Sequence, residues 1–210
     1  MTPEKRAERE DQIAKAAYAL LEERGYGGVS MLMIARQAHA SNETLYRWYG
    51  DKAGLFRALV ARNAAEVTET LTAGLAQDAP FAETMERFGT QLLTLLLGDR
   101  AVALNRAAAA DATGALGAAL SAAGRESVLP ILAKLLERER AAGRLAFDDA
   151  TDSVTDSAQL YLALLIGDRQ VRRIIGRTGA PSPAEARRLS ARALARYLQL
   201  SAPGRSGPRA

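Results

Sequence analysis

Residues 30–56 of this chain read SMLMIARQAHASNETLYRWYGDKAGLF, and they decide how its first part folds. Ser30 and Ser41 each precede a run with helical spacing. A serine hydroxyl at such a place can accept a backbone N–H that has no partner inside the first turn. Apolar residues recur at helical spacing behind these two caps, at Ile34, Ala35, Ala38, Leu45 and Tyr49. The stretch therefore predicts two short helices joined by a tight turn, with a third helix starting directly afterwards.

This arrangement predicts a helix-turn-helix. The second short helix has small polar residues at its front, Asn42, Glu43 and Thr44, and the apolar Leu45 behind them. In a helix-turn-helix the second helix inserts its N-terminal residues into the major groove of DNA. The two helices of such a motif must also cross closely, and Ala35 is small enough to allow this. The stretch therefore indicates a DNA-binding module.

The segment before the motif predicts a helix that packs on it. Its apolar stripe consists of Ile13, Ala16, Ala17, Leu20 and Leu21. Gly25 stands where a left-handed C-terminal cap is expected. With this helix included, residues 13–57 resemble the DNA-binding domain of the TetR/AcrR family of bacterial transcriptional regulators. The matching positions keep the spacing of that family without a break, and they are Ile13, Ala17, Leu20, Gly25, Tyr26, Ser30, Ile34, Ala35, Ala38, Ser41, Thr44, Leu45, Tyr46, Lys52, Leu55 and Phe56.

Two places depart from the pattern of the family. The family usually has Gly and then Val in the turn, where this chain has His39 and Ala40. A turn residue there often needs a positive φ, which histidine tolerates better than β-branched residues do. The usual His-Phe pair after the tyrosine is Trp48 and Tyr49 here, which keeps an aromatic anchor but changes what position 48 offers to DNA. Neither change breaks the motif.

The resemblance implies two kinds of DNA contact. It places Asn42, Glu43 and Thr44 at base edges, where asparagine can bind adenine N6 and N7 and glutamate can accept from cytosine N4. Arg47 could serve either kind of contact, and we predict base reading for it. The predicted phosphate contacts, which position a domain without reading sequence, are Ser30, Tyr46, Trp48 and Lys52. A helix N-terminus adds to the attraction of Lys52 for phosphate, whereas a structural role is an equal alternative for Trp48.

The charge distribution agrees with DNA binding. Residues 1–24 carry five basic and six acidic side chains, a net charge of −1, whereas residues 25–63 carry five basic and two acidic ones, a net charge of +3. The basic excess therefore falls on the motif. Lys5, Arg6 and Arg9 lie in an N-terminal segment that we expect to be frayed, from which they could reach phosphates or the minor groove. A flexible solubilising tail is the alternative.

Composition excludes several classes of function. The chain has 210 residues, no cysteine, and His39 as its only histidine. Disulfides, thiol catalysis and cysteine-bound metals are therefore excluded, and we predict no catalytic residue, no cofactor and no metal site. No apolar run approaches the roughly 18–20 residues that cross a bilayer, and the apolar stretch of a signal peptide is missing. We expect a soluble, cytoplasmic protein that does not bind membranes and is not an enzyme.

Helical periodicity continues through the rest of the chain, without the alternation typical of strands. It predicts an all-α fold of about nine helices, the later ones near residues 52–76, 81–97, 99–113, 116–142, 149–175 and 182–199. Pro130 should kink its helix or begin a new first turn. The predicted domains are a three-helix helix-turn-helix DNA-binding domain at 1–51, a helical effector-binding and dimerisation domain at 52–200, and a disordered tail at 201–210.

The predicted helix at 149–175 contains LYLALLIG, which is apolar on all sides and so must be covered on all sides. A second copy of the chain could provide part of this cover, together with the helix that follows. The family resemblance also implies an interface of two helices from each subunit. The predicted interface residues are Tyr161, Leu164, Leu165, Leu189, Ala193 and Tyr197. A hairpin buried within one chain is the alternative.

By family analogy, a small-molecule pocket would lie among the middle helices. Candidate lining residues, apolar with a few polar groups, are Phe81, Met85, Phe88, Asn105, Asp111 and Tyr161. The alternative for each is an ordinary core or surface position. A separate acidic cluster, which could bind a metal, consists of Asp148, Asp149, Asp152 and Asp156. Carboxylates at a helix start also cap backbone N–H groups, and we predict capping here.

These features predict a homodimeric transcriptional repressor that binds a palindromic operator in double-stranded DNA. A small, largely apolar effector would bind the C-terminal domain and release the protein from the operator. The alternative is an accessory or architectural DNA-binding protein without a ligand, which predicts weak sequence preference and a steep dependence on salt. An enzyme that uses paired carboxylates is a third hypothesis, but no stretch of the sequence isolates such a pair.

Overall fold

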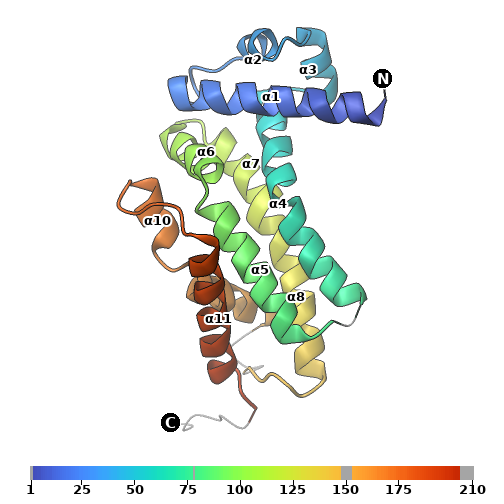
Figure 1. The fold of residues 1–210 in the computed structure, drawn as a ribbon, viewed down its shortest axis with the longest axis vertical. Coiled ribbons are helices and arrows are strands. Elements are labelled where there is room, and N and C mark those ends of the chain that lie inside the picture. Colours follow the sequence, from blue (N-terminus) through green and yellow to red (C-terminus); the bar gives the residue numbers. More distant parts are fainter. Residues whose placement is uncertain (1, 78, 148–152, 204–210) are drawn as a thin grey trace. The chain divides into compact units, whose positions relative to one another are not determined.

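The computed structural model describes residues 2–77, 79–147 and 153–203 (Figure 1). These residues form an all-α fold without strands, which confirms the predicted fold class. Their eleven α-helices are α1 (Pro3–Arg24), α2 (Met31–Gln37), α3 (Asn42–Tyr49), α4 (Lys52–Ala76), α5 (Phe81–Leu96), α6 (Asp99–Ala110), α7 (Ala115–Leu120), α8 (Glu126–Ala141), α9 (Val154–Ile166), α10 (Arg169–Ile174) and α11 (Pro183–Leu200). A π-helical turn at Ser121–Arg125 joins α7 to α8. None of the helices within this described part is both long and apolar enough to cross a membrane.

The chain divides into two compact units that do not follow its linear order. The first unit contains residues 1–63 and 99–124, so α6 and α7 belong with α1–α3 and the first part of α4. The second unit contains residues 64–98 and 125–210, which include the rest of α4, α5 and α8–α11. The domain boundary predicted after residue 51 is a boundary between functions, DNA binding and effector binding. The two compact units are defined by packing, so this boundary stays a prediction.

The core of the first unit is built on the predicted apolar stripes. Side chains that are at most 4% exposed there include Ile13, Ala17, Leu21, Ile34, Ala35, Leu45, Leu55, Phe56, Leu104 and Leu116. The ring of Tyr26 packs edge-on against that of Phe56, with the centroids 5.4 Å apart. The predicted stripes are therefore confirmed, except at Tyr49, which is only half-buried.

Local capping sets the ends of the short helices as predicted. The Oγ of Ser30 accepts from the backbone N–H of Met33 at 3.3 Å, and the Oγ of Ser41 accepts from that of Thr44 at 3.0 Å. Gly25 ends α1 as predicted with a positive φ of 64°, which glycine adopts without a steric penalty, but its ψ of 171° lies outside the left-handed helical region. The local sequence is thus sufficient to place these helix ends.

The start of α1 differs from the prediction. The helix begins at Pro3, and it includes the segment around Lys5 that was expected to be frayed. Thr2 caps the helix. Pro3 occupies its first position, where a backbone N–H would have no hydrogen-bond partner within the helix. The lysine, arginine, glutamate and alanine residues that follow favour helix. The expectation of a frayed segment was wrong because the Thr2 cap, Pro3 and these helix-favouring residues stabilise the first turns.

Two predicted long helices are interrupted. The helix expected at 149–175 is α9 and α10, separated at Gly167, which has a φ of 52°. The helix expected at 116–142 is α7, the π-helical turn and α8, and Pro130 lies in the second turn of α8 rather than in a new first turn. These interruptions account for eleven helices where about nine were expected. Residues 148–152 lie outside the described part of the chain.

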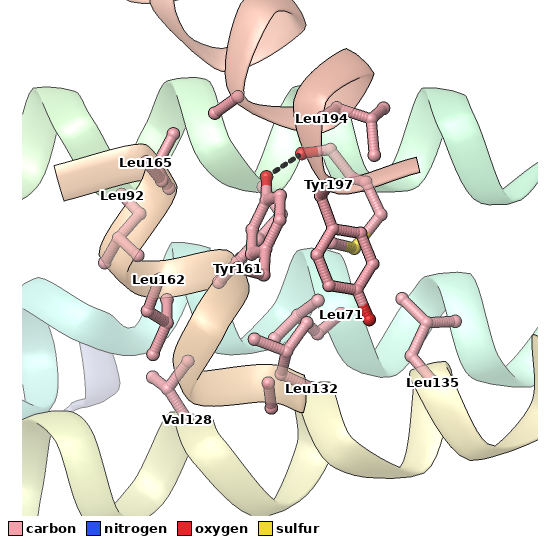
Figure 2. Close-up of a cluster of buried hydrophobic side chains, with 14 of the residues drawn as sticks. Leu71, Leu92, Val128, Leu132, Leu135, Tyr161, Leu162, Leu165, Leu194 and Tyr197 are labelled. Atoms are coloured by element: carbon pink, nitrogen blue, oxygen red, sulfur yellow. Dashed lines mark hydrogen bonds between the residues drawn. The ribbon is translucent and has the colours of Figure 1, made fainter. Parts of the chain in front are cut away.

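Two tyrosines lie at the centre of the core of the second unit (Figure 2). Tyr161 of α9 and Tyr197 of α11 are fully buried and meet edge to face, with ring centroids 5.5 Å apart. The hydroxyl of Tyr161 donates to the carbonyl of Met85 at 3.2 Å, and that of Tyr197 shares a 2.6 Å hydrogen bond with Ser157. Burial raises the pKa of both phenols, so both hydroxyls stay neutral. These contacts join α9 and α11 within one chain.

The end of the folded part lies beyond the predicted start of the tail. Ser201 is 4% exposed, and its carbonyl accepts from the backbone N–H of Ala146 at 2.9 Å. A buried residue with such a hydrogen bond belongs to the folded structure, so the prediction of disorder from residue 201 was wrong there. Residues 204–210 lie outside the described residues.

Candidate nucleic-acid interface

The helix-turn-helix consists of α2, the turn at residues 38–41 and α3. The backbone N–H of Ala40 donates to the carbonyl of Ala35 at 2.9 Å and closes the turn. His39 has a φ of 51°, as predicted for this position. From α1, the Nη1 of Arg9 donates to the carbonyl of His39 at 2.7 Å. The turn is therefore held both by its own backbone and by a side chain from the preceding helix.

The predicted base-reading side chains all lie on α3. Leu45 is fully buried and anchors this helix in the core of the first unit. Glu43 and Arg47 are exposed, and because they are four residues apart they share one face of the helix. Asn42 and Thr44 are partly buried. Glu43 and Arg47 are thus the predicted base readers that solvent reaches most easily.

Two of the predicted base readers have polar atoms turned toward the motif. The hydroxyls of Thr44 and Ser41 share a hydrogen bond of 2.7 Å. The Oδ1 of Asn42 is buried and has no hydrogen-bond partner among the described residues. A buried acceptor without a partner is destabilising. The side chains of Asn42 and Thr44 are thus less accessible from outside the chain than those of Glu43 and Arg47.

The predicted phosphate contacts differ in their surroundings. Tyr46 is 50% exposed, and Ser30 is exposed although its hydroxyl caps α2. Trp48 is partly buried, with the guanidinium carbon of Arg6 5.2 Å from its ring centroid. Its ring also meets that of Tyr49 edge-on at 6.2 Å. Trp48 therefore has the structural contacts that were the alternative to DNA binding.

Lys52 connects the start of α4 to the loop between α1 and α2. Its Nζ donates to the carbonyls of Tyr26 at 2.7 Å and Val29 at 3.0 Å. The same nitrogen lies 4.1 Å from the ring centroid of Tyr26. An ammonium group has three donors, so the predicted phosphate contact would have to use the one that remains.

Two arginines of α1 have roles that we did not predict. Arg9 reaches the turn, and Arg6 packs on Trp48 while its Nε forms an ion pair of 2.9 Å with Glu10. The spacing of Arg6 and Glu10 and the proline at position 3 are signals for helix in this segment. The contacts with the turn and with Trp48 join residues far apart in the sequence, so no local pattern indicates them.

The predicted pocket residues of the second unit have different surroundings. Phe81 lines a cavity of about 480 Å³. Met85, Phe88 and Tyr161 are fully buried in the hydrophobic core of this unit. Phe81 is therefore the one of these four that the structure places at the cavity.

The other two predicted pocket residues belong to the first unit. The Nδ2 of Asn105 donates to the carbonyl of Ala101 at 2.8 Å, one turn earlier in α6. The carboxylate of Asp111 accepts from the backbone N–H of Leu116 at 3.0 Å. Both side chains thus stabilise local backbone, and the six predicted residues do not form one set.

The cavity beside Phe81 combines apolar walls with charged side chains. Its other lining residues are Ala79, Pro80, Ala82, Arg138, Glu139, Arg144, Leu145 and Leu198. The side chain of Glu139 is 3% exposed, and it accepts from the Nε of Arg144 at 2.6 Å and the Nη2 of Arg144 at 3.0 Å. These bonds hold the pKa of Glu139 below its ordinary value. The Nε of Arg138 lies 3.4 Å from the same carboxylate.

Most of the predicted interface side chains are buried within one chain. The side chains that are at most 9% exposed are Tyr161, Leu165, Leu189, Ala193 and Tyr197, and Leu164 is half-buried. This is the arrangement expected for a hairpin buried inside the chain. The apolar surface that α9 leaves exposed lies at other positions, chiefly Leu160, which is 42% exposed.

Asp156 caps the start of α9. Its carboxylate accepts from the backbone N–H of Ser153 at 3.0 Å, and the hydroxyl of Ser153 accepts from the N–H of Asp156 at 3.2 Å. Hydrogen bonds from Ser153 hold the pKa of Asp156 below its ordinary value. Capping is therefore confirmed at Asp156, whereas Asp148, Asp149 and Asp152 lie outside the described residues. Within the described ranges, no group of three or more histidine, aspartate and glutamate side chains is placed to hold a metal ion.

An N-terminal helix-turn-helix with an exposed polar front, followed by a second helical unit, defines the class of helix-turn-helix DNA-binding regulators. The family model for bacterial regulatory proteins of the tetR family matches residues 13–59. The model for the C-terminal domain of AefR-like transcriptional repressors matches residues 83–200. The chain therefore belongs to the TetR family of transcriptional regulators, with an AefR-like C-terminal domain. Regulators of this family are DNA-binding transcription factors and not enzymes.

Solved structures of regulators share this fold along almost the whole chain. A TetR-family regulator from Mesorhizobium loti is 24% identical, with 96% of this chain and 100% of that chain covered and a TM-score of 0.72. A TetR transcriptional regulator from Agrobacterium tumefaciens is 27% identical, with 96% of both chains covered and a TM-score of 0.69. The flavonoid-responsive regulator FrrA is 26% identical, with 93% and 98% covered and a TM-score of 0.67. Comparison with curated proteins finds no match.

Proposed function

We propose that this regulator is a homodimeric repressor that leaves a palindromic operator when a small ligand binds its second unit. The main observation in favour of DNA binding is that α3 has one buried side and one exposed polar side. Leu45 is fully buried, whereas Glu43, Tyr46 and Arg47 are exposed. An exposed polar face on the second helix of such a motif has the chemistry to meet base edges and phosphates.

Pairing of two chains would match the symmetry of a palindromic operator. Two recognition helices read successive major grooves when they lie about 34–36 Å apart, or a multiple of that distance. Because Tyr161 and Tyr197 are buried within the chain, a second chain would meet the exposed side of α9 instead. That side includes Leu160, Ala163 and the half-buried Leu164. We therefore assign the pairing surface to these residues of α9.

The cavity beside Phe81 is our candidate for the ligand site. Its volume of about 480 Å³ suits a small molecule. Its apolar walls, Phe81, Leu145 and Leu198 among them, favour a small, largely apolar ligand. Ligand regulation also has a precedent at 26% identity, in a regulator described as flavonoid-responsive.

Release from DNA would follow from a difference in ligand affinity between two conformations. The helix α4 contributes Leu55 and Phe56 to the core of the first unit and Val67 and Leu71 to that of the second. We therefore propose that α4 transmits the effect of ligand binding to the DNA-binding unit. The ligand can lower the affinity for DNA only as far as it binds one conformation more tightly than the other. The factor lost in DNA affinity therefore cannot exceed the ratio of the ligand's affinities for the two conformations.

Selection of binding sites from a random duplex library at near-physiological salt tests this proposal, with Tyr46→Ala as the matched variant. We expect an inverted repeat that the wild-type protein enriches and the variant does not. If a folded, dimeric protein enriched no sequence, the proposal of sequence-specific binding would be overturned. An architectural DNA-binding protein would then be favoured.

The ligand part of the proposal has its own test. The selected operator complex is titrated with a panel of small, largely apolar compounds. We expect at least one of them to dissociate the wild-type complex and to have a weaker effect on Phe81→Ala. Equal action on both proteins would contradict the assignment of the cavity.

A further inference from the structure

The first turns of α1 contact the helix-turn-helix at two places. The Nη1 of Arg9 lies 2.7 Å from the carbonyl oxygen of His39 and 3.4 Å from that of Ala38. The guanidinium of Arg6 lies over the ring of Trp48 on α3, 5.2 Å from its centroid. One arginine thus meets the turn, and another on the same helix meets the recognition helix.

The turn has a reason to need this support. His39 adopts a left-handed φ of 51°, which is disfavoured for a residue that has a side chain. A charge-assisted hydrogen bond from Arg9 to the carbonyl of the same residue stabilises this conformation. Because α3 begins at Asn42, only three residues later, the backbone of the turn sets the direction in which α3 leaves it.

The surroundings of Arg9 do not suit a phosphate contact. The residues next to it include Glu8, Glu10 and Asp11, and residues 1–24 have a net charge of −1. Binding to the DNA backbone depends on clustered positive charge. Arg9 is also half-buried, and its guanidinium already faces two backbone carbonyls.

We propose that Arg9 is a positioning residue for DNA recognition, which holds the strained turn and so sets the orientation of α3, with Arg6 supporting α3 through Trp48. This inference rests on the proposed DNA-reading function. Arg9 acts through the backbone of His39 and does not touch DNA. Its removal therefore weakens binding without removing a phosphate contact.

The experiment compares Arg9→Met with Lys15→Met, which removes the same charge from an exposed position on the same helix. Affinity for the selected operator is measured between about 50 and 200 mM salt, a range over which phosphate contacts produce a steep dependence. We expect Arg9→Met to bind about tenfold more weakly with an unchanged salt slope, and Lys15→Met to bind like the wild type. A slope that flattens by about 0.9 in Arg9→Met would identify a phosphate contact and overturn the proposal.

Rescue by glycine distinguishes positioning from general loss of structure. Glycine adopts a φ near 51° without strain, so His39→Gly removes the need for the support. We expect the double variant Arg9→Met/His39→Gly to recover to within about threefold of the affinity of His39→Gly alone. Unchanged loss in the double variant would contradict the proposal.

A measurement without DNA separates this inference from the proposed function. Trp48 is the only tryptophan of the chain, so its fluorescence reports on α3 directly. We expect acrylamide to quench Trp48 more in Arg9→Met than in the wild type, and His39→Gly to reverse this change. Identical quenching in all variants would overturn the positioning role, whereas failure of the wild type to select any operator would count against the proposed function alone.

Discussion

The Nζ of Lys52 donates a 2.7 Å hydrogen bond to the carbonyl of Tyr26 and lies 4.1 Å from the centroid of the same residue's ring. One side chain therefore holds both the backbone and the aromatic ring of the loop before α2. The ring of Tyr26 in turn packs against Phe56, one turn further along α4 than Lys52. The start of α4 is thus attached to this loop by a polar and an apolar contact together.

This relationship gives the first prediction. We expect Lys52→Met to lower the free energy of unfolding by about 1–3 kcal/mol, because two charge-assisted hydrogen bonds and a cation–π contact are lost. Arg57→Met, an exposed position on the same helix, is the control and should change stability little. Urea unfolding followed by circular dichroism measures both.

The same variant distinguishes two roles of Lys52 toward DNA. As a phosphate contact, Lys52 would contribute to the salt dependence, and its removal would flatten the slope by about one unit. With its ammonium held by Tyr26 and Val29, we expect weaker binding with little change in slope. A clearly flatter slope for Lys52→Met would support the phosphate contact predicted from the sequence.

Glu43 carries the second prediction. It is exposed in the first turn of α3, where a carboxylate can accept from cytosine N4. We expect Glu43→Ala to relax base preference at one position of each half-site and to weaken binding less than Tyr46→Ala does. Binding of each variant to the selected operator and to its single-base variants measures preference and affinity separately. Equal loss of preference and affinity in both variants would contradict the division into base readers and phosphate contacts.

Glu139 gives a prediction for pH. Hydrogen bonds from Arg144 lower its pKa in the folded protein, so the pair stabilises the fold fully above the unfolded pKa of about 4.3. That contribution is lost as the pH falls through the lower, folded pKa. We expect Glu139→Gln to be less stable than the wild type at pH 7, by up to about 3 kcal/mol, and the difference to shrink below pH 4.

The control for this prediction is Glu137→Gln on the same helix. Glu137 forms an ion pair with Arg140 in which both side chains are at least one-third exposed. Such a pair contributes about 0–1 kcal/mol. Urea midpoints measured from pH 7 to pH 3 should therefore separate the two variants at neutral pH, and parallel curves would contradict the role of the buried carboxylate.

Close packing at Gly89 gives the fourth prediction. A Cβ added there would lie 2.8 Å from the hydroxyl of Tyr161 and would also collide with the side chain of Ser190. We expect Gly89→Ala to lower the stability by about 1–3 kcal/mol, although alanine favours helix. The matched control is Gly117→Ala in α7, where nothing lies within 4 Å of the added Cβ. This control should be neutral or stabilising, by about 0.4–1 kcal/mol, in the same unfolding assay.

The proposed pairing surface gives the fifth prediction. Leu160 is 42% exposed on α9, and a charge placed there would be buried at the interface between two chains. We expect Leu160→Asp to yield monomers in analytical ultracentrifugation while thermal melting still shows a folded chain. Leu32→Asp alters a leucine that is 45% exposed on α2 and should remain dimeric. A dimeric Leu160→Asp would exclude this face of α9 as the pairing surface.

The sequence was sufficient to predict the helix-turn-helix because its signals are local. Ser30 and Ser41 cap their helices, and Ile34 and Leu45 are buried, since capping and helical periodicity involve residues within one or two turns of each other. Gly25 ends α1 with a positive φ for the same reason. The all-α fold followed from the same periodicity, continued along the chain.

Only the tertiary structure decided what each of these helices meets. Helical periodicity indicates that Tyr161 and Tyr197 are buried, but it does not distinguish burial by a second chain from burial against each other. Nor could it show that Arg9 holds the turn at His39, or that Lys52 holds the loop at Tyr26. The physical reason is that a local pattern specifies which side of a helix avoids water, whereas the partner on that side depends on how residues far apart in the chain come together.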